Sequence, residues 1–445
     1  MPDERHILNR LPLIGHIFDG HMREVVKGAA SAFIWRVVGA GAQFVCNMLL
    51  ARMLGAEGFG LYALAMTVTA FTTVIGSAGF DQTLVRFTPA HADSGESGAI
   101  RTLFVRGFVV TLVVSLCAAL VLFLAADLIA QQIFNNASLT SVIRLMALSV
   151  PPWSLMNLIA GSLQGLKRIR ESTLVQVGLV PFINMALIYI LLSAGYGVYG
   201  AAVAYLLSTC VVLALGLFLW FRHCGTGDDG TRHKAVSTGV LVSTAVPMAL
   251  TALMIMSMSL ADTLILGAMR PPFELGVYSG ALKLSMITSI VLMAFSAIAA
   301  PKFASFYAER DVNAIRRIGS HSIRLMLATA APVLALSFIA PGFFMSVFGA
   351  SFRAGATALV ILTLGQAVYI TFGLAGQLLM MTGQEVAVRN ITLAAAIVNI
   401  ILCLVLIPPL GAVGAALSHT ASFSMTALLS QYVLKRRMNI YLHPF

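Results

Sequence analysis

Residues 172–221 read STLVQVGLVPFINMALIYILLSAGYGVYGAAVAYLLSTCVVLALGLFLWF, an apolar run without one Asp, Glu, Lys or Arg. A membrane-crossing helix needs about 20 predominantly apolar residues, so this run is too long for one span. A turn signal, Gly195-Tyr196-Gly197, lies near its middle. The run therefore predicts two membrane-spanning helices joined by a tight hairpin.

The composition of the whole chain fits the same class. Of its 445 residues, 59% are hydrophobic and 10% are charged, whereas soluble domains average about 25% charged residues. Twelve spans would take about 240 residues and leave no room for a sizeable soluble catalytic domain. The net charge of +11 would suit a nucleic-acid-binding protein. A membrane protein, however, collects Lys and Arg in its cytoplasmic loops, so we expect no nucleic-acid partner.

Charged residues delimit the spans, because a Lys, Arg or Asp at the centre of a membrane helix costs about 2.5–3.5 kcal/mol. A second uncharged run, 391–434, contains the turn signal Pro408-Pro409-Leu410-Gly411 and divides into another hairpin. We predict an all-α polytopic membrane protein with about twelve transmembrane helices. The predicted spans are 29–53, 58–80, 107–126, 142–166, 173–194, 198–221, 237–267, 276–300, 322–346, 355–380, 388–407 and 411–434.

The positive charges predict the orientation. With both termini in the cytoplasm, 22 of the 28 Lys and Arg residues fall in inward segments and 4 in outward segments, as the positive-inside rule requires. The predicted organisation is a cytoplasmic segment 1–28, a six-helix bundle 29–222, a cytoplasmic linker 223–236, a six-helix bundle 237–436 and a cytoplasmic tail 437–445.

An internal duplication relates the two halves at an offset of about 215 residues. Each half has six spans, an even number, so both enter the membrane in the same sense and should be related by a pseudo-two-fold axis along the membrane normal. Parallel repeats of this kind occur in alternating-access transporters, which hold the substrate between the halves. The recurring segments are 60–65 (GLYALA) with 276–281 (GVYSGA), Ala160-Gly161 with Ala375-Gly376, 200–208 (GAAVAYLLS) with 414–422 (GAALSHTAS), and Asn184 with Asn399.

Three segments resemble a known family. Residues 49–65 (LLARMLGAEGFGLYALA) resemble the first-hairpin signature of the polysaccharide transporters, the O-antigen and exopolysaccharide flippases of the multidrug/oligosaccharidyl-lipid/polysaccharide (MOP) superfamily. Residues 399–416 are similar to that family's C-terminal hairpin, and 262–278 to its seventh and eighth spans. The resemblance implies a V-shaped pair of six-helix bundles around a cavity lined chiefly by spans 1, 2, 7 and 8.

The same resemblance implies a transporter and not an enzyme. Its substrate would be a polyprenyl-diphosphate-linked oligosaccharide, flipped from the inner to the outer leaflet of a bacterial inner membrane for O-antigen, capsule or exopolysaccharide synthesis. The implied partners are this substrate, the lipid bilayer, and a polysaccharide polymerase with its chain-length machinery.

Three alternatives stay open. A cation-coupled multidrug exporter would be expected to carry acids in its cavity. A lipid II flippase of the same superfamily usually has two more C-terminal spans. A polysaccharide polymerase or ligase would need a large outward loop with catalytic residues, whereas the longest outward connection, 127–141, has no Lys or Arg and one acid.

Arg36, Gln43 and Asn47 are candidate substrate-binding residues in the first span. They recur at i, i+7 and i+11, which at about 100° per residue places them within about 20° of one helix face. A guanidinium and two amides suit a wet cavity that handles phosphate and sugar hydroxyls. The alternative is that Arg36 snorkels to the cytoplasmic headgroups.

Two charged residues of the seventh and eighth spans are further candidates. Lys283 is expected in the cavity, with outward snorkelling or a structural ion pair as the alternative. An acid within a span is a functional candidate by default, and Asp262 is placed in this way. We expect it either to pair with Lys283 or Arg270, or to take part in proton or sodium coupling.

The remaining polar and helix-breaking residues are expected to have structural roles, with one exception. Pro247 interrupts the seventh span and is a hinge candidate. Asn184, Asn399 and His419 are expected to form helix–helix hydrogen bonds. The alternative is that they are substrate ligands or, for His419, a proton carrier. The sequence contains no metal-binding cluster, catalytic triad or cofactor motif, so we expect no metal and no cofactor.

Reporter fusions measure this topology. Fusions after residues 95, 230 and 310 should report from the cytoplasm, and fusions near 135, 196 and 410 from outside, because of the charge asymmetry of the loops. Paired phosphatase and fluorescent-protein fusions at each position give complementary signals. An external signal at 310, within the most basic loop, would contradict the twelve-span topology.

Overall fold

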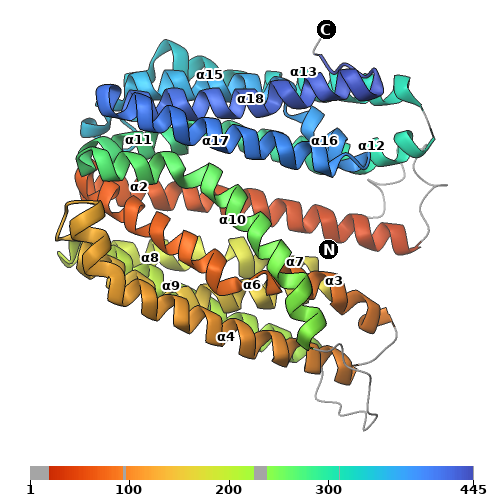
Figure 1. Cartoon of the computed structure of the whole chain (residues 1–445), viewed down its shortest axis with the longest axis horizontal. Helices are drawn as coiled ribbons and strands as arrows, with labels where there is room; N and C mark the ends of the chain where they lie inside the picture. The colour runs from red at the N-terminus through yellow and green to blue at the C-terminus, as the bar shows by residue number, and fades with distance from the viewer. Residues whose placement is uncertain (1–19, 94–96, 225–237, 310, 444–445) are drawn as a thin grey trace, which may run out of the picture.

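The computed structural model describes residues 20–93, 97–224, 238–309 and 311–443, and throughout these ranges the chain is helical with short connections (Figure 1). The predicted segments 1–28, 223–236 and 437–445 lie partly outside these ranges, and their assignment stays a prediction. The α-helices are α2 (Gly20–Ser77), α3 (Phe80–Asp93), α4 (Ser97–Leu128), α5 (Leu139–Ala147), α6 (Val150–Gly165), α7 (Ile169–Thr173), α8 (Val180–Ser193), α9 (Gly197–Cys224), α10 (Thr238–Met269), α11 (Pro272–Ser285), α12 (Ile287–Ala308), α13 (Val312–Ile339), α14 (Pro341–Met345), α15 (Ala356–Phe372), α16 (Leu374–Met381), α17 (Glu385–Leu410) and α18 (Ala412–Met438). Shorter π- and 3₁₀-helical segments are η1 (Ile129–Ile133), η2 (Leu174–Gly178) and η3 (Ala350–Gly355).

The described residues contain eleven helical segments that are long and apolar enough to cross a membrane. The first, Ile34–Ser77, has 44 residues, about twice the length that one span needs. At Gly55 the backbone has a φ of +68°, a left-handed conformation that glycine adopts without strain. Figure 1 shows that α2 doubles back within its length, so this segment supplies two spans. The prediction of twelve spans is confirmed for the described chain.

The two turn signals within the uncharged runs end helices where predicted. α8 ends at Ser193 and α9 begins at Gly197. α17 ends at Leu410, and Gly411, with a φ of +55°, precedes α18. These turns and the bend at Gly55 lie at one end of the molecule, which we call the hairpin end. The opposite end, where α2 begins and α18 finishes, is called the terminal end.

Two helices are longer than the predicted spans. α4 begins at Ser97 and α13 at Val312, ahead of the predicted starts at 107 and 322. A charge limits the apolar part of a helix but does not end the helix, so these two boundaries were wrong. The additional turns carry Arg101, Arg106, Arg316 and Arg317.

The helices form two groups, which converge at the hairpin end and diverge toward the terminal end (Figure 1). The first group contains α2 to α9 and the second α11 to α18, while α10 crosses between them. Within the first group, Trp220 stacks on Phe104 and donates a 2.9 Å hydrogen bond to Ser162. The core of the second group includes the fully buried Phe303. This arrangement is the two-bundle fold predicted from the sequence.

α2 and α11 cross with their backbones in direct contact. A Cβ atom on Gly276 would lie 1.7 Å from the carbonyl oxygen of Ala56, and a Cβ atom on Gly60 would lie 2.0 Å from the carbonyl oxygen of Pro272. Ala56 corresponds to Pro272, and Gly60 to Gly276, at the same offset of 216 residues. Reciprocal contacts between equivalent positions are the mark of a two-fold relation. The pseudo-two-fold axis therefore passes close to this crossing.

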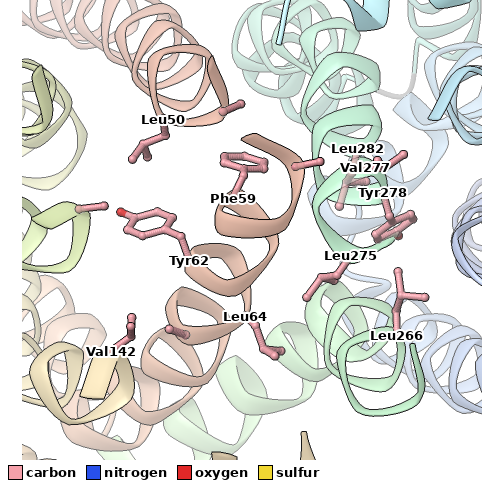
Figure 2. Close-up of a cluster of buried hydrophobic side chains, with 14 of the residues drawn as sticks. Leu50, Phe59, Tyr62, Leu64, Val142, Leu266, Leu275, Val277, Tyr278 and Leu282 are labelled. Carbon is pink, nitrogen blue, oxygen red and sulfur yellow. The ribbon is translucent and has the colours of Figure 1, made fainter. Parts of the chain in front are cut away.

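Figure 2 shows the side chains on both sides of the crossing. Tyr62 of α2 points into the first group, and Tyr278 of α11 points away from α2 into the second group. Phe59 is 2% exposed and Leu275 is fully buried. The crossing thus joins the groups through an apolar layer, while each tyrosine reaches the interior of its own group.

Candidate functional site

The first half of α2 has one apolar face and one polar face. Ile34, Val38 and Val45 are exposed hydrophobic residues on the first face. Arg36 is also exposed, and it is two residues from Ile34, or about 200° around the helix. Arg36 therefore points away from the face that suits lipid.

The other members of the predicted α2 stripe differ in exposure. Gln43 is exposed, whereas Asn47, one turn closer to the crossing, is 8% exposed. The polar face of α2 consequently becomes more enclosed from the terminal end toward the hairpin end. This gradient is what a cavity closed at the hairpin end would produce.

Lys283 lies in the most enclosed helix of the second group. Residues 275–282, 284 and 285 of α11 are buried, and Lys283 is exposed between them. Within the described part of the chain, no hydrogen bond or ion pair joins Lys283 or Arg36 to another residue. Both cations therefore keep their hydrogen-bonding capacity for water or a ligand.

The hairpin end is closed by contacts between the two groups. Arg52 Nε of α2 donates a 2.8 Å hydrogen bond to the carbonyl oxygen of Val347. Phe59 of α2 contacts Phe348 and Phe352 at ring-centroid distances of 6.2 and 5.8 Å. Together with the glycine crossing, these contacts separate the space between the groups from the hairpin end.

Asp262 of α10 lies at the centre of a buried polar cluster in the second group. It is fully buried and accepts a hydrogen bond from the hydroxyl of Tyr278 in α11. Its Oδ2 also lies 2.8 Å from Nδ1 of His419 in α18, which is 2% exposed. Its Oδ1 accepts a 2.9 Å hydrogen bond from the backbone N–H of Thr263. Three helices are therefore joined through one carboxylate.

Both ion-pair partners that the sequence suggested for Asp262 are wrong. Arg270 pairs instead with Glu274, with 3.1 Å between Arg270 Nη2 and Glu274 Oε1. Glu274 Oε2 also accepts a 3.2 Å hydrogen bond from the backbone N–H of Ala412 at the start of α18. Lys283 follows Tyr278 by five residues, or about 140° around α11, and so lies on a different face.

Further polar side chains extend the cluster along α17 and α18. Asn399 donates a 3.0 Å hydrogen bond to Ser422, and Ser422 donates a 2.9 Å hydrogen bond to the carbonyl oxygen of His419. The helix–helix hydrogen bonds expected of Asn399 and His419 are thus present. Sequence reasoning did not predict that Tyr278 and His419 are the partners of Asp262. The signal available was the duplication, in which Tyr62 and Tyr278 recur.

α10 contacts both groups, and Pro247 lies at one of its contact points. A Cβ atom on Gly79, just before α3, would lie 2.3 Å from the carbonyl oxygen of Ala245. Met248 lies 4.0 Å from the hydroxyl of Thr83 in α3. Pro247 therefore lies within the stretch of α10 that packs on the first group, about four turns before Asp262.

Comparisons with known proteins agree with this architecture. A family model described as "Polysaccharide biosynthesis protein" matches residues 25–307, and a second model, MatE, matches residues 247–405. A curated relative, the probable low-salt glycan biosynthesis flippase Agl15 of Haloferax volcanii, is 22% identical over 434 residues. That alignment covers 94% of this chain and 85% of the relative.

Two solved structures share the fold. An inward-facing multidrug resistance MATE family transporter of the MOP superfamily has a TM-score of 0.73 at 16% identity, covering 92% of this chain and 98% of that one. The lipid II flippase MurJ in an inward closed conformation has a TM-score of 0.69 at 14% identity, covering 92% of this chain and 87% of that one. At these identities the likeness concerns the fold.

Gly276→Ala should open the hairpin end, because its methyl group would meet backbone atoms of α2 that cannot rotate away. Spin labels on Tyr196→Cys and Ser351→Cys, both exposed positions in different groups, report the separation of the groups there. With the five native cysteines replaced, the population at the short distance should fall several-fold.

Gly41→Ala is the matched control for this measurement. Gly41 also lies in α2, and a Cβ atom there would meet no atom within 4 Å. This variant should keep the distance distribution of the parent protein. An unchanged distribution for Gly276→Ala would show that the crossing does not hold the hairpin end closed.

Proposed function

This chain belongs to the polysaccharide biosynthesis protein family, and from that premise we propose that it flips a polyprenyl-diphosphate-linked oligosaccharide from the inner to the outer leaflet by alternating access. The family and the structural neighbours are membrane transporters or flippases. The oligosaccharide, the lipid carrier and the direction of transport are parts of the proposal.

The observation that carries the proposal is that neither Arg36 nor Lys283 has a hydrogen-bond or ion-pair partner among the described residues. An arginine or lysine within a span costs about 2.5–3.5 kcal/mol unless it meets water, an anion or a partner. A diphosphate would supply the missing negative charge, and a guanidinium can hold phosphate oxygens through two parallel hydrogen bonds. Gln43 and Asn47, further along the same face, would meet sugar hydroxyls.

The charge of these side chains favours an anionic substrate over a cationic drug. A cation-coupled multidrug exporter would be expected to carry acids facing the interior, whereas Arg36 and Lys283 are basic. Asp262 is the one fully buried acid among the described residues, and Tyr278 and His419 hold it inside the second group. Lipid II, which also carries a diphosphate, is the alternative substrate. The deletion experiment below distinguishes it from the proposed oligosaccharide lipid.

Alternating access requires the groups to close at the terminal end and open at the hairpin end. We propose that Pro247 is the hinge in α10 for this movement, because proline removes a backbone hydrogen bond at the contact between α10 and α3. With both termini in the cytoplasm, as the sequence predicts, the open end would face the cytoplasm, and the membrane would be a bacterial inner membrane. A polymerase with its chain-length machinery would receive the flipped substrate.

Deletion of the gene tests the proposal most directly. The expected result is accumulation of a polyprenyl-diphosphate-linked oligosaccharide on the cytoplasmic face, identified by mass spectrometry of the lipid extract. Accumulation of lipid II would favour the alternative substrate. A lipid extract with neither intermediate would contradict a flippase function.

Arg36→Ala should lose most of the transport activity, by about tenfold or more, since hydrogen bonds to charged groups contribute about 1.5–3 kcal/mol. Arg36→Lys should keep part of it, because an ammonium retains the charge but not the bidentate geometry. The measurement is complementation of the deletion strain, normalised to the amount of protein in the membrane.

Arg101→Ala is the matched control, because Arg101 is an exposed arginine in the first turns of α4. It should complement at the level of the parent protein. Normal transport by Arg36→Ala at parental abundance would mean that Arg36 only snorkels to the lipid headgroups. The proposed substrate-binding role of Gln43 and Asn47 would then be rejected as well.

A further inference from the structure

The buried cluster around Asp262 has a counterpart at the equivalent positions of the first group. The duplication that relates Gly60 to Gly276 also relates the other members of the two clusters. The corresponding pairs are Asp262 with Cys46, Tyr278 with Tyr62, His419 with Tyr205, and Asn399 with Asn184. The two halves therefore place four side chains alike but differ in their chemistry.

The counterpart in the first group contains no carboxylate and no imidazole among these positions. Asn184 Nδ2 donates to Cys46 Sγ at 3.6 Å, and Cys46, Tyr62 and Tyr205 are 0%, 5% and 5% exposed. Thiols and phenols are neutral near pH 7 in ordinary surroundings. The same helix arrangement thus forms without an ionisable acid and base, so the pair of Asp262 and His419 is not a requirement of the fold.

The pair of Asp262 and His419 can bind one more proton. When Asp262 is ionised and His419 is neutral, Nδ1 of His419 carries the hydrogen that bonds Asp262 Oδ2, and Nε2 carries a lone pair. Within the described part of the chain, Nε2 is buried and has no hydrogen-bond partner. Uptake of a proton at Nε2 changes the net charge of the pair from −1 to zero, which relieves the cost of one uncompensated buried charge.

The donor set suits a proton better than a metal ion. Hard cations take about six or more oxygen ligands. Here both oxygens of Asp262 already accept hydrogen bonds, one from Tyr278 and one from Thr263. Among the described residues, no group of three or more His, Cys, Asp or Glu side chains could hold a metal ion.

We propose that Asp262 and His419 form a proton-binding site that loads and unloads as the two helix groups move, with Tyr278 as a positioning residue. This inference rests on the transport function proposed above. It names the ion that drives the movement and the second group as the place where the ion binds.

The position of the site explains how proton exchange and movement are linked. Asp262 is fully buried, so a proton reaches it only when α10, α11 and α18 separate from one another. α10 also packs on the first group through Ala245 and Met248. A change in the attraction between α10 and α18 is therefore transmitted to the contact between the two groups.

Among the described residues, two other ionisable groups lie near the pair, one in α11 and one in α17, and an aromatic ring of α18 covers the imidazole. Tyr278 of α11 donates to Asp262, and the thiol of Cys403 in α17 is within electrostatic reach of the same carboxylate. In α18, the ring of Phe423 stacks on His419 at 4.2 Å between centroids. Of these side-chain types, imidazole is the one whose unperturbed charge change falls between about pH 5 and 8.

The test follows the spin-label distance between positions 196 and 351 in purified, substrate-free protein in phospholipid nanodiscs. Between about pH 5 and 8, the population at the short distance should change several-fold. Asp262→Asn removes the charge at constant shape. His419→Tyr installs the residue type that the first group carries at the equivalent position. Each variant should abolish the pH response while keeping the fold, as judged by size-exclusion profile and helical circular dichroism.

Tyr205→Phe, at the position in the first group that corresponds to His419, is the matched control and should keep the full response. Tyr278→Phe should weaken the response but not abolish it, because Tyr278 positions the carboxylate and does not itself take up the proton.

Three outcomes would overturn the proposal: a pH response that persists in Asp262→Asn, a parent protein without a pH response, and a response to sodium at constant pH. The protein sample contains no substrate, so the result of this distance measurement does not depend on the lipid analysis of the deletion strain. A pH response together with no accumulated lipid intermediate would keep the proton site and reject the flippase function.

Discussion

The structure depends on a contact that leaves no space for a single side-chain atom. Gly60 and Gly276 bring the backbones of α2 and α11 together, and the hydrogen bond from Arg52 and the phenylalanine rings surround that contact. α10 has 32 residues and is therefore about 48 Å long. A small rotation at one end of helices of this length gives a large separation at the other end, so the glycine crossing can act as a pivot.

The exposed cations Arg36 and Lys283 are kept apart from the buried acid Asp262. The exposed Arg36 and Lys283 have no partner among the described residues, while the buried Asp262 is satisfied by Tyr278 and His419. A structural ion pair would have brought Asp262 within hydrogen-bonding distance of Arg36 or Lys283. The separation suits the two proposed roles. The cations would bind a ligand between the groups, and the acid would take part in binding a proton inside the second group.

The sequence predicted the features that depend on local chemistry. Charges and turn residues located twelve spans and the hairpins at Gly195 and Gly411. The repeat matched Gly60 to Gly276 but did not predict that their helices cross there. The pairing of Asp262 with His419 could not be predicted in this way, because the two residues are 157 positions apart. Their contact depends on how α10 and α18 are rotated about their axes. The ion pair of Arg270 with Glu274 could have been predicted from the sequence, since the two residues have the i, i+4 spacing of a surface helix pair.

The course of α10 makes the two lateral faces of the protein unequal. In the first span, Gly39 packs so closely on its own group that a Cβ atom would lie 2.6 Å from the carbonyl oxygen of Val177. The equivalent residue of α10, Ile255, is 54% exposed, because α10 has left its group to contact α3 (Figure 1). The two repeats therefore present unlike lateral faces, so a fold built from a symmetric repeat acquires a sidedness within the plane of the membrane.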